Sequence, residues 1–140
     1  GTGTARAGSI KSGVFRGGGR MFGPRPRNYG FKLNKKLRKV ARRSALTTKL
    51  TNGELIVMED LSFDTIRTKS YNEFLSNCDL LGKKSLLVVA EENKNIYLSA
   101  RNLKGAKVIS ASQVNTYDIS NASKVLLCES SISVIEQNLS

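Results

Sequence analysis

Residues 86–90, Leu-Leu-Val-Val-Ala, form the apolar run that decides the fold class. Three similar runs lie at 55–58 (Leu-Ile-Val-Met), at 107–109 (Lys-Val-Ile) and at 125–128 (Val-Leu-Leu-Cys). Apolar runs without polar alternation are typical of strands that are buried on both faces, as in a parallel sheet. We therefore predict four strands in a mainly parallel sheet.

Helical segments separate these runs. Apolar residues recur at helical spacing over 68–81, over 94–103 and in a last segment that carries Ile132, Ile135 and Leu139. A repeated strand–helix–strand succession implies right-handed crossovers and layered packing. The sequence therefore predicts a globular α/β domain over 53–140, with flanking helices on a mainly parallel sheet.

The basic residues are concentrated in the first part of the chain. The 140 residues carry 23 Lys plus Arg and 11 Asp plus Glu, a formal charge of +12, and the first carboxylate is Glu54. Residues 1–53 therefore carry +14 and residues 54–140 carry −2. Such an excess of cations favours a polyanionic partner for the first part. We expect the slightly acidic remainder not to protect RNA.

Two different segments make up this basic part. Residues 1–32 hold nine of the 12 glycines and both prolines, so they bury little apolar surface and we predict an extended Gly/Arg-rich loop arm. Residues 33–52 contain neither glycine nor proline and predict a basic helix capped near Asn34. The apolar face expected to dock this helix on the domain consists of Leu33, Leu37, Val40, Ala41 and Leu50.

Aromatic rings alternate with cations in the arm. Phe15, Phe22 and Tyr29 are suited to stack on unpaired bases while neighbouring cations bind phosphates. A flexible charged tail is the alternative interpretation, but the charge and aromatic pattern favours a segment ordered by RNA. The RNA-binding candidates are Arg6, Lys11, Arg16, Arg20, Arg25, Arg27, Tyr29, Lys32, Lys35, Lys36, Arg38, Lys39, Arg42 and Arg43.

Catalytic and cofactor-binding patterns are scarce. The sequence has no histidine, which excludes Ser-His triads, Cys-His dyads and histidine-bearing zinc sites. The glycine-rich stretches match neither phosphate-loop pattern, and no cofactor or metal is predicted. The acid pairs Glu59-Asp60 and Glu91-Glu92 follow two strands, where α/β enzymes bind ligands. They leave an α/β enzyme as an alternative, although such pairs are more often solvated loop residues.

The cysteines and the hydropathy point to a protein of the cytoplasm. Cys78 and Cys128 lie in apolar surroundings and are expected to be packing residues, which suits a reducing compartment. No apolar stretch approaches the length of a transmembrane helix, about eighteen residues, so no membrane partner is predicted.

Four stretches of the chain carry a family resemblance. They are GTGTARAGSIKSG (1–13), GGGRMFGPRPRNYGFKLNKK (17–36), RKVARRSAL (38–46) and NIYLSARNL (95–103). Together they resemble the bacterial large-subunit ribosomal protein L four family, also called uL-four, over nearly the whole chain. The resemblance implies a non-enzymatic, RNA-binding structural protein of the large ribosomal subunit. It also implies an α/β domain on the outer side of the subunit and a loop that threads through 23S ribosomal RNA to the peptide exit tunnel.

The resemblance implies roles for individual segments as well. Arg16 to Arg27 match the descending side of the loop, and Lys35 to Arg43 match the basic helix. Implied partners are 23S ribosomal RNA, neighbouring large-subunit proteins and, near the loop tip, the nascent chain and macrolides. Some family members repress their own operon, so an RNA-binding regulator is a further alternative. The residues matched to the tunnel-lining loop tip are Gly1, Thr2, Gly3, Thr4 and Arg6.

The chain departs from the family pattern at three points. Gly13 stands where members usually have proline, and Phe15 stands where they have tryptophan, although phenylalanine keeps a ring for stacking. Members also begin roughly sixty residues earlier, with a strand, a helix and the ascending side of the loop. We therefore expect a longer protein whose sheet has one strand more.

Overall fold

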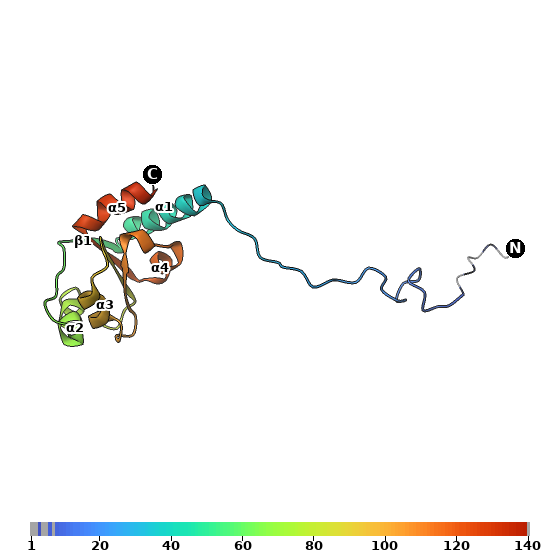
Figure 1. Ribbon diagram of the computed structural model, residues 1–140, viewed down its shortest axis with the longest axis horizontal. Coiled ribbons are helices and arrows are strands. Elements are labelled where there is room, and N and C mark those ends of the chain that lie inside the picture. Colours follow the sequence, from blue (N-terminus) through green and yellow to red (C-terminus); the bar gives the residue numbers. More distant parts are fainter. Residues whose placement is uncertain (1–2, 4–5, 7, 140) are drawn as a thin grey trace. The chain divides into compact units, whose positions relative to one another are not determined.

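The chain contains two compact units, Gly1–Lys32 and Leu33–Ser140. The computed structural model describes residues 3, 6 and 8–139. All helices and strands of the described part lie in the second unit, coloured from cyan to red in Figure 1.

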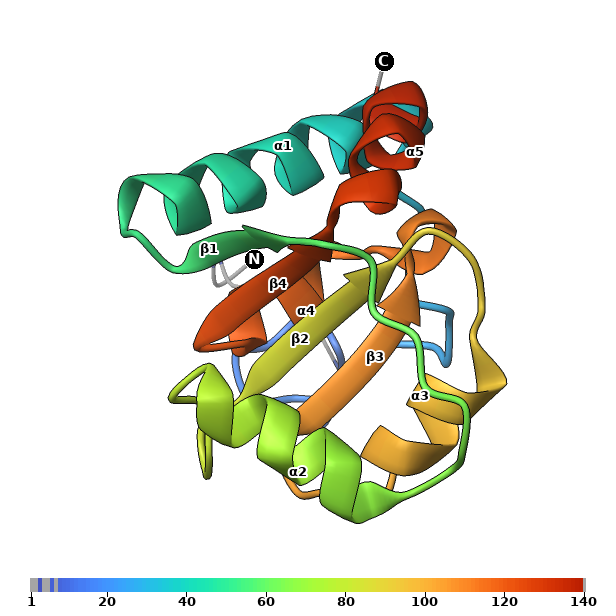
Figure 2. The ribbon, with the colours of Figure 1, turned by 90° about the vertical axis from the view of Figure 1, so that its left-hand side faces the viewer.

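Four parallel strands form one sheet (Figure 2): β1 (Leu55–Met58), β2 (Ser85–Val89), β3 (Ala106–Ser110) and β4 (Lys124–Cys128). Their order in the sheet is β1-β4-β2-β3. Leu86 of β2 lies opposite Lys107 of β3 on one side and Val125 of β4 on the other. All five residues of β2 are buried, because neighbouring strands flank it and helices cover both faces. The predicted parallel sheet and its four members are confirmed.

Helices cover both faces of the sheet. On one face, α2 (Thr68–Asn77) and α3 (Lys94–Ala100) pack over a core that includes Leu87 and Leu126. On the other face the core includes Leu86 and Val125, and the covering helices are α1 (Lys35–Thr51), α4 (Thr116–Asn121) and α5 (Glu129–Leu139). This arrangement confirms the layered α/β prediction with flanking helices.

Two short elements were not predicted. The 3-10 turn η1 (Ala111–Gln113) and α4 follow β3, and α4 begins where the Asn115 side chain accepts the N–H of Asp118 at 2.8 Å. Both elements are too short to show a helical period in the sequence. Two predicted helices are also shorter than expected, because Cys78 ends α2 and Arg101 ends α3.

The start of α1 agrees with the sequence, whereas its docking face does not. The Asn34 side chain accepts the N–H of Leu37 at 2.9 Å, so the predicted cap is confirmed. The predicted apolar face was wrong, because Leu33, Leu37, Val40 and Leu50 are exposed and only Ala41 of that set is half-buried.

A different face of α1 packs on the domain. Ala45 and Leu46 contact the core beside α4 and α5, and Arg42 and Lys49 are half-buried next to them. The alkyl stems of arginine and lysine cover apolar surface while their charged ends reach polar partners. Lys49 Nζ lies 2.6 Å from the Glu54 carboxylate and 2.7 Å from a backbone carbonyl oxygen of the α4–β4 turn.

The first unit contains a series of tight turns. The N–H of Gly19 donates to the Lys11 carbonyl at 2.9 Å, and the N–H of Gly18 donates to the Phe15 carbonyl at 3.1 Å. A Cβ at Gly18 would lie 2.0 Å from the Ser12 carbonyl oxygen, so this turn requires glycine. A Cβ at Gly13 would lie 2.8 Å from the Gly19 carbonyl oxygen, which gives a local reason for glycine at this departure from the family pattern.

Candidate nucleic-acid interface

The outward surface of α1 is densely cationic. Lys35, Lys36 and Arg38 are exposed in the first two turns, and the first turn contains no acidic residue. A helix N-terminus carries a partial positive charge, so cations there repel the helix dipole as well as one another. A bound polyanion relieves both repulsions, which makes this surface suited to phosphates.

The remaining α1 candidates differ in their surroundings. Lys39 and Arg42 are half-buried, and Arg42 Nε lies 3.4 Å from the Arg38 carbonyl oxygen. Arg43 is exposed, but its guanidinium donates to the Leu139 carbonyl near the end of α5. That contact joins two helices and places a cation at a helix C-terminus, where the dipole favours it. Arg43 therefore also has a structural role that the sequence did not reveal.

The cations and rings predicted in the arm are accessible. Phe22 is 96% exposed and Tyr29 is 69% exposed, while Phe15 is partly shielded at 45%. The Arg27 guanidinium lies 4.3 Å from the centre of the Tyr29 ring, a cation–π contact that presents a ring and a charge together. The other exposed candidates are Arg6, Lys11, Arg16, Arg20, Arg25 and Lys32.

Part of the predicted loop tip falls outside the described residues. Gly1, Thr2 and Thr4 lie there, so their tunnel-lining role stays a prediction. Gly3 has φ +73°, a left-handed conformation that favours glycine, and Arg6 is exposed.

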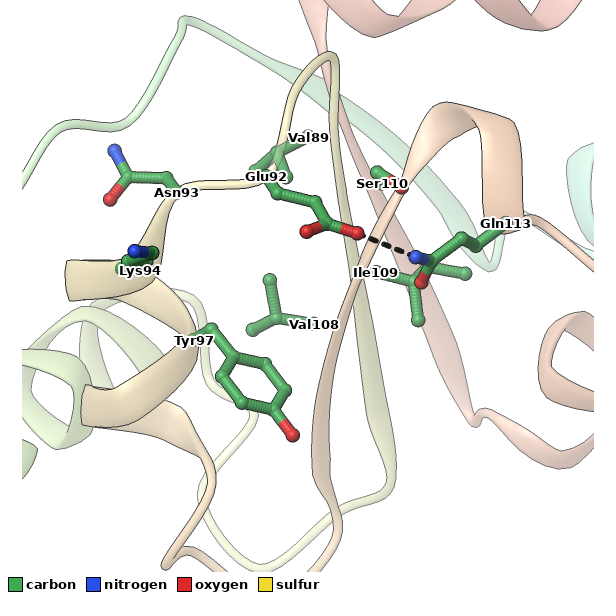
Figure 3. Close-up of a pocket in the computed structure, with 9 residues that line it drawn as sticks. All are labelled: Val89, Glu92, Asn93, Lys94, Tyr97, Val108, Ile109, Ser110 and Gln113. Carbon is green, nitrogen blue, oxygen red and sulfur yellow. Dashed lines mark hydrogen bonds between the residues drawn. The ribbon is translucent and has the colours of Figure 1, made fainter.

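The acid pairs at the strand ends hold neighbouring segments together. The Asp60 carboxylate accepts the Ser130 hydroxyl at 2.7 Å and so joins the end of β1 to the start of α5. Gln113 donates to Glu92 at 2.6 Å, and both side chains line a cavity of about 270 Å³ (Figure 3). Among residues 3, 6 and 8–139, no three His, Cys, Asp or Glu side chains are grouped as a metal site. These contacts support the structural interpretation of the acid pairs.

The two cysteines pack within the core face covered by α2 and α3. Cys128 is buried there and Cys78 is half-buried against the same cluster, and both are free thiols. Burial raises the pKa of the Cys128 thiol above its ordinary value. The prediction that both residues serve packing is confirmed.

Comparison with known proteins identifies the family. The model of the ribosomal protein L4/L1 family matches residues 1–138. The chain belongs to this family. It is 56% identical over its whole length to the large ribosomal subunit protein uL4 of Christiangramia forsetii, covering 67% of that protein. It is also 52% identical to the protein of the same name from Amoebophilus asiaticus, over 99% of this chain and 66% of that protein.

Membership of the uL4 family confirms the resemblance found in the sequence. A uL4 protein is a non-enzymatic structural protein of the large ribosomal subunit, so the enzyme alternative is not retained. The chain spans about two thirds of the length of these relatives. In the part of the chain that the structure describes, no helix is long and apolar enough to cross a membrane.

Proposed function

We propose that this uL4 chain binds 23S ribosomal RNA as a structural constituent of the large subunit, through residues 1–53. In this proposal the loop arm reaches the peptide exit tunnel, where Gly1 to Arg6 lie near the nascent chain and macrolides. Neighbouring large-subunit proteins are further partners. The observation that carries the proposal is the cationic surface of α1, which remains outward while Ala45 and Leu46 hold the helix on the domain.

Electrostatics supplies most of the expected affinity. Residues 1–53 contain fourteen cations and no carboxylate, so no acid within this segment competes with phosphate. If six to ten of these cations contact phosphates, affinity should fall by roughly 10³ to 10⁵ between 50 and 200 mM salt. Rings such as Phe22 and Tyr29 add stacking on unpaired bases, worth about 1–3 kcal/mol per base.

Paired lysine substitutions test the role of α1 directly. The full chain is bound to 23S ribosomal RNA, and the slope of log affinity against log salt is measured for wild type and for K35Q/K36Q. Loss of two phosphate contacts should reduce the slope by about 1.4 to 1.8. The matched control is K69Q/K94Q, which removes the same charge from two exposed lysines of the globular unit. Equal slopes for the two variants would contradict the proposal.

A further inference from the structure

The charged residues of the globular unit are sorted between the two ends of the sheet. Because all four strands run in one direction, the residues that precede them meet at one edge and the residues that follow them meet at the other. We call the side of the sheet where the strands begin the strand-start edge, and the side where they end the strand-end edge. The strand-start edge carries Lys83 and Lys84 before β2, Lys104 before β3 and Lys124 at the start of β4. The strand-end edge carries Glu59, Asp60, Glu91, Glu92 and Glu129.

Backbone contacts bring the lysine-bearing turns together. The N–H groups of Ser123 and Lys124 both donate to the Lys84 carbonyl, at 2.7 and 3.3 Å. A Cβ at Gly105, which has φ +89°, would lie 3.3 Å from the Lys83 carbonyl oxygen, so the turn before β3 lies against the turn before β2. Figure 2 shows β2, β3 and β4 starting at the same side of the sheet. Neighbouring strands are about 4.8 Å apart, so these lysines share one surface.

These lysines keep their positive charge available. Lys83, Lys84 and Lys104 are exposed, Lys124 is half-buried, and within the described ranges none of the four forms an ion pair. Lys84 Nζ donates to the Asn121 side-chain oxygen at 2.9 Å, but a neutral amide does not cancel its charge.

The carboxylates closest to this edge are largely engaged elsewhere. Glu54 pairs with Lys49 at 2.6 Å, and Asp118 pairs with Lys107 at 2.7 Å. Asp79, four residues before Lys83, is exposed and lowers the net charge of the surface by one. Four lysines therefore outweigh the remaining acid, and the edge is a cationic surface within residues 54–140, whose net charge is −2.

We propose that the strand-start edge is a second RNA contact, which binds the phosphate backbone separately from α1. This inference rests on the proposed function, because both take RNA as the partner. Lysine is depleted at protein–protein interfaces but is a common point-charge ligand of phosphates, so the composition of this edge favours RNA over an acidic protein. The acidic strand-end edge repels the same polyanion and so orients the domain.

The C-terminal end of α1 lies next to the strand-start edge, so both RNA contacts belong to the same unit. Lys49, in the last turn of α1, donates to the Ala122 carbonyl at 2.7 Å, and Ala122 lies two residues before Lys124. The C-terminal end of α1 therefore meets the strand-start edge within the same unit. Although the net charge of −2 suggested that residues 54–140 would not protect RNA, the placement of their lysines argues for a direct contact.

Lysine labelling locates the contact. The full chain is acetylated with an amine-reactive reagent, free and bound to 23S ribosomal RNA, and the modified lysines are quantified by mass spectrometry. We expect RNA to protect Lys83, Lys84, Lys104 and Lys124 several-fold but to leave Lys69 and Lys94 unchanged. Protection of Lys35 and Lys36 with none at the four edge lysines would overturn the second contact alone. An absence of protection at every lysine would overturn the proposed function as well.

Salt dependence tests the same surface by substitution. K83Q/K104Q changes two exposed lysines of the edge, and K69Q/K94Q removes the same net charge elsewhere in the unit. We expect K83Q/K104Q to reduce the salt slope by about 1.4 to 1.8, so that its affinity falls about tenfold less than that of wild type between 50 and 200 mM salt. A slope equal to that of K69Q/K94Q, with circular dichroism showing both variants folded, would overturn the inference.

Discussion

The ion pair between Lys107 of β3 and Asp118 of α4 joins a strand to its covering helix asymmetrically. Lys107 Nζ donates to both carboxylate oxygens at 2.7 Å. The lysine side chain is 56% exposed, whereas that of Asp118 is 5% exposed. Asp118 also accepts the Asn115 side-chain amide at 2.7 Å. Two substitutions that break the same pair therefore leave very different groups behind.

The loss of unfolding free energy for each substitution depends on which charged group it leaves without a partner. Lys107→Met keeps the alkyl stem but leaves a buried carboxylate with Asn115 as its remaining side-chain partner. Leaving a buried carboxylate without its cation in this way costs about 3 kcal/mol of unfolding free energy. Asp118→Asn leaves an ammonium group that is already half in water, and the amide still accepts hydrogen bonds, so the expected loss is about 1 kcal/mol.

Urea denaturation of the full chain at pH 7, followed by far-UV circular dichroism, measures both losses. The double variant should resemble Asp118→Asn to within about 0.5 kcal/mol, because the buried charge that makes Lys107→Met costly is then absent. Equal losses for the two single variants, or a larger loss for Asp118→Asn, would refute the reasoning. Either result would mean that burial of the carboxylate does not govern the strength of this contact.

Three further predictions concern α1, the core and the loop tip. Leu46→Ala should lower the unfolding free energy by about 1–2 kcal/mol in urea titrations, whereas Leu37→Ala, at a side chain 51% exposed, should change it by less than about 0.5 kcal/mol. Tyr71 is fully buried, its hydroxyl has no hydrogen-bond partner among the residues that the structure describes, and burial raises its pKa above the ordinary value of about 10. The unfolded chain therefore loses that proton first and stability falls above about pH 10. Tyr71→Phe should reduce the loss of stability between pH 8 and pH 11 in denaturation curves without lowering stability at pH 7. Arg6→Ala should alter the protection of tunnel RNA by a macrolide in chemical footprinting of assembled subunits, and an unchanged footprint would count against the tunnel role.

The elements of the fold were predictable where hydrophobicity is periodic or continuous. The continuous apolar runs at 86–90 and 125–128 are typical of buried strands. Asn34 has a side chain that is preferred at the N-terminal cap of a helix. The docking face of α1 was not predictable from apolar residues. It uses the stems of Arg42 and Lys49 next to Ala45, so that charged residues face inward while Leu37 faces outward.

Net charge was the least informative quantity for the globular unit, because it averages over positions that the fold separates. Lys84, Lys104 and Lys124 are spaced by twenty residues, which is close to the separation of the strand starts at Ser85, Ala106 and Lys124. Residues at that period return to the same edge of a parallel sheet, as residues at i and i+4 return to one face of a helix. The period was therefore present in the sequence, but it acquires meaning only once the strands are known to be parallel and to start beside one another. The same topology places Glu59 and Glu91 at the opposite edge, so residues 54–140, with a net charge of −2, present one cationic side and one acidic side.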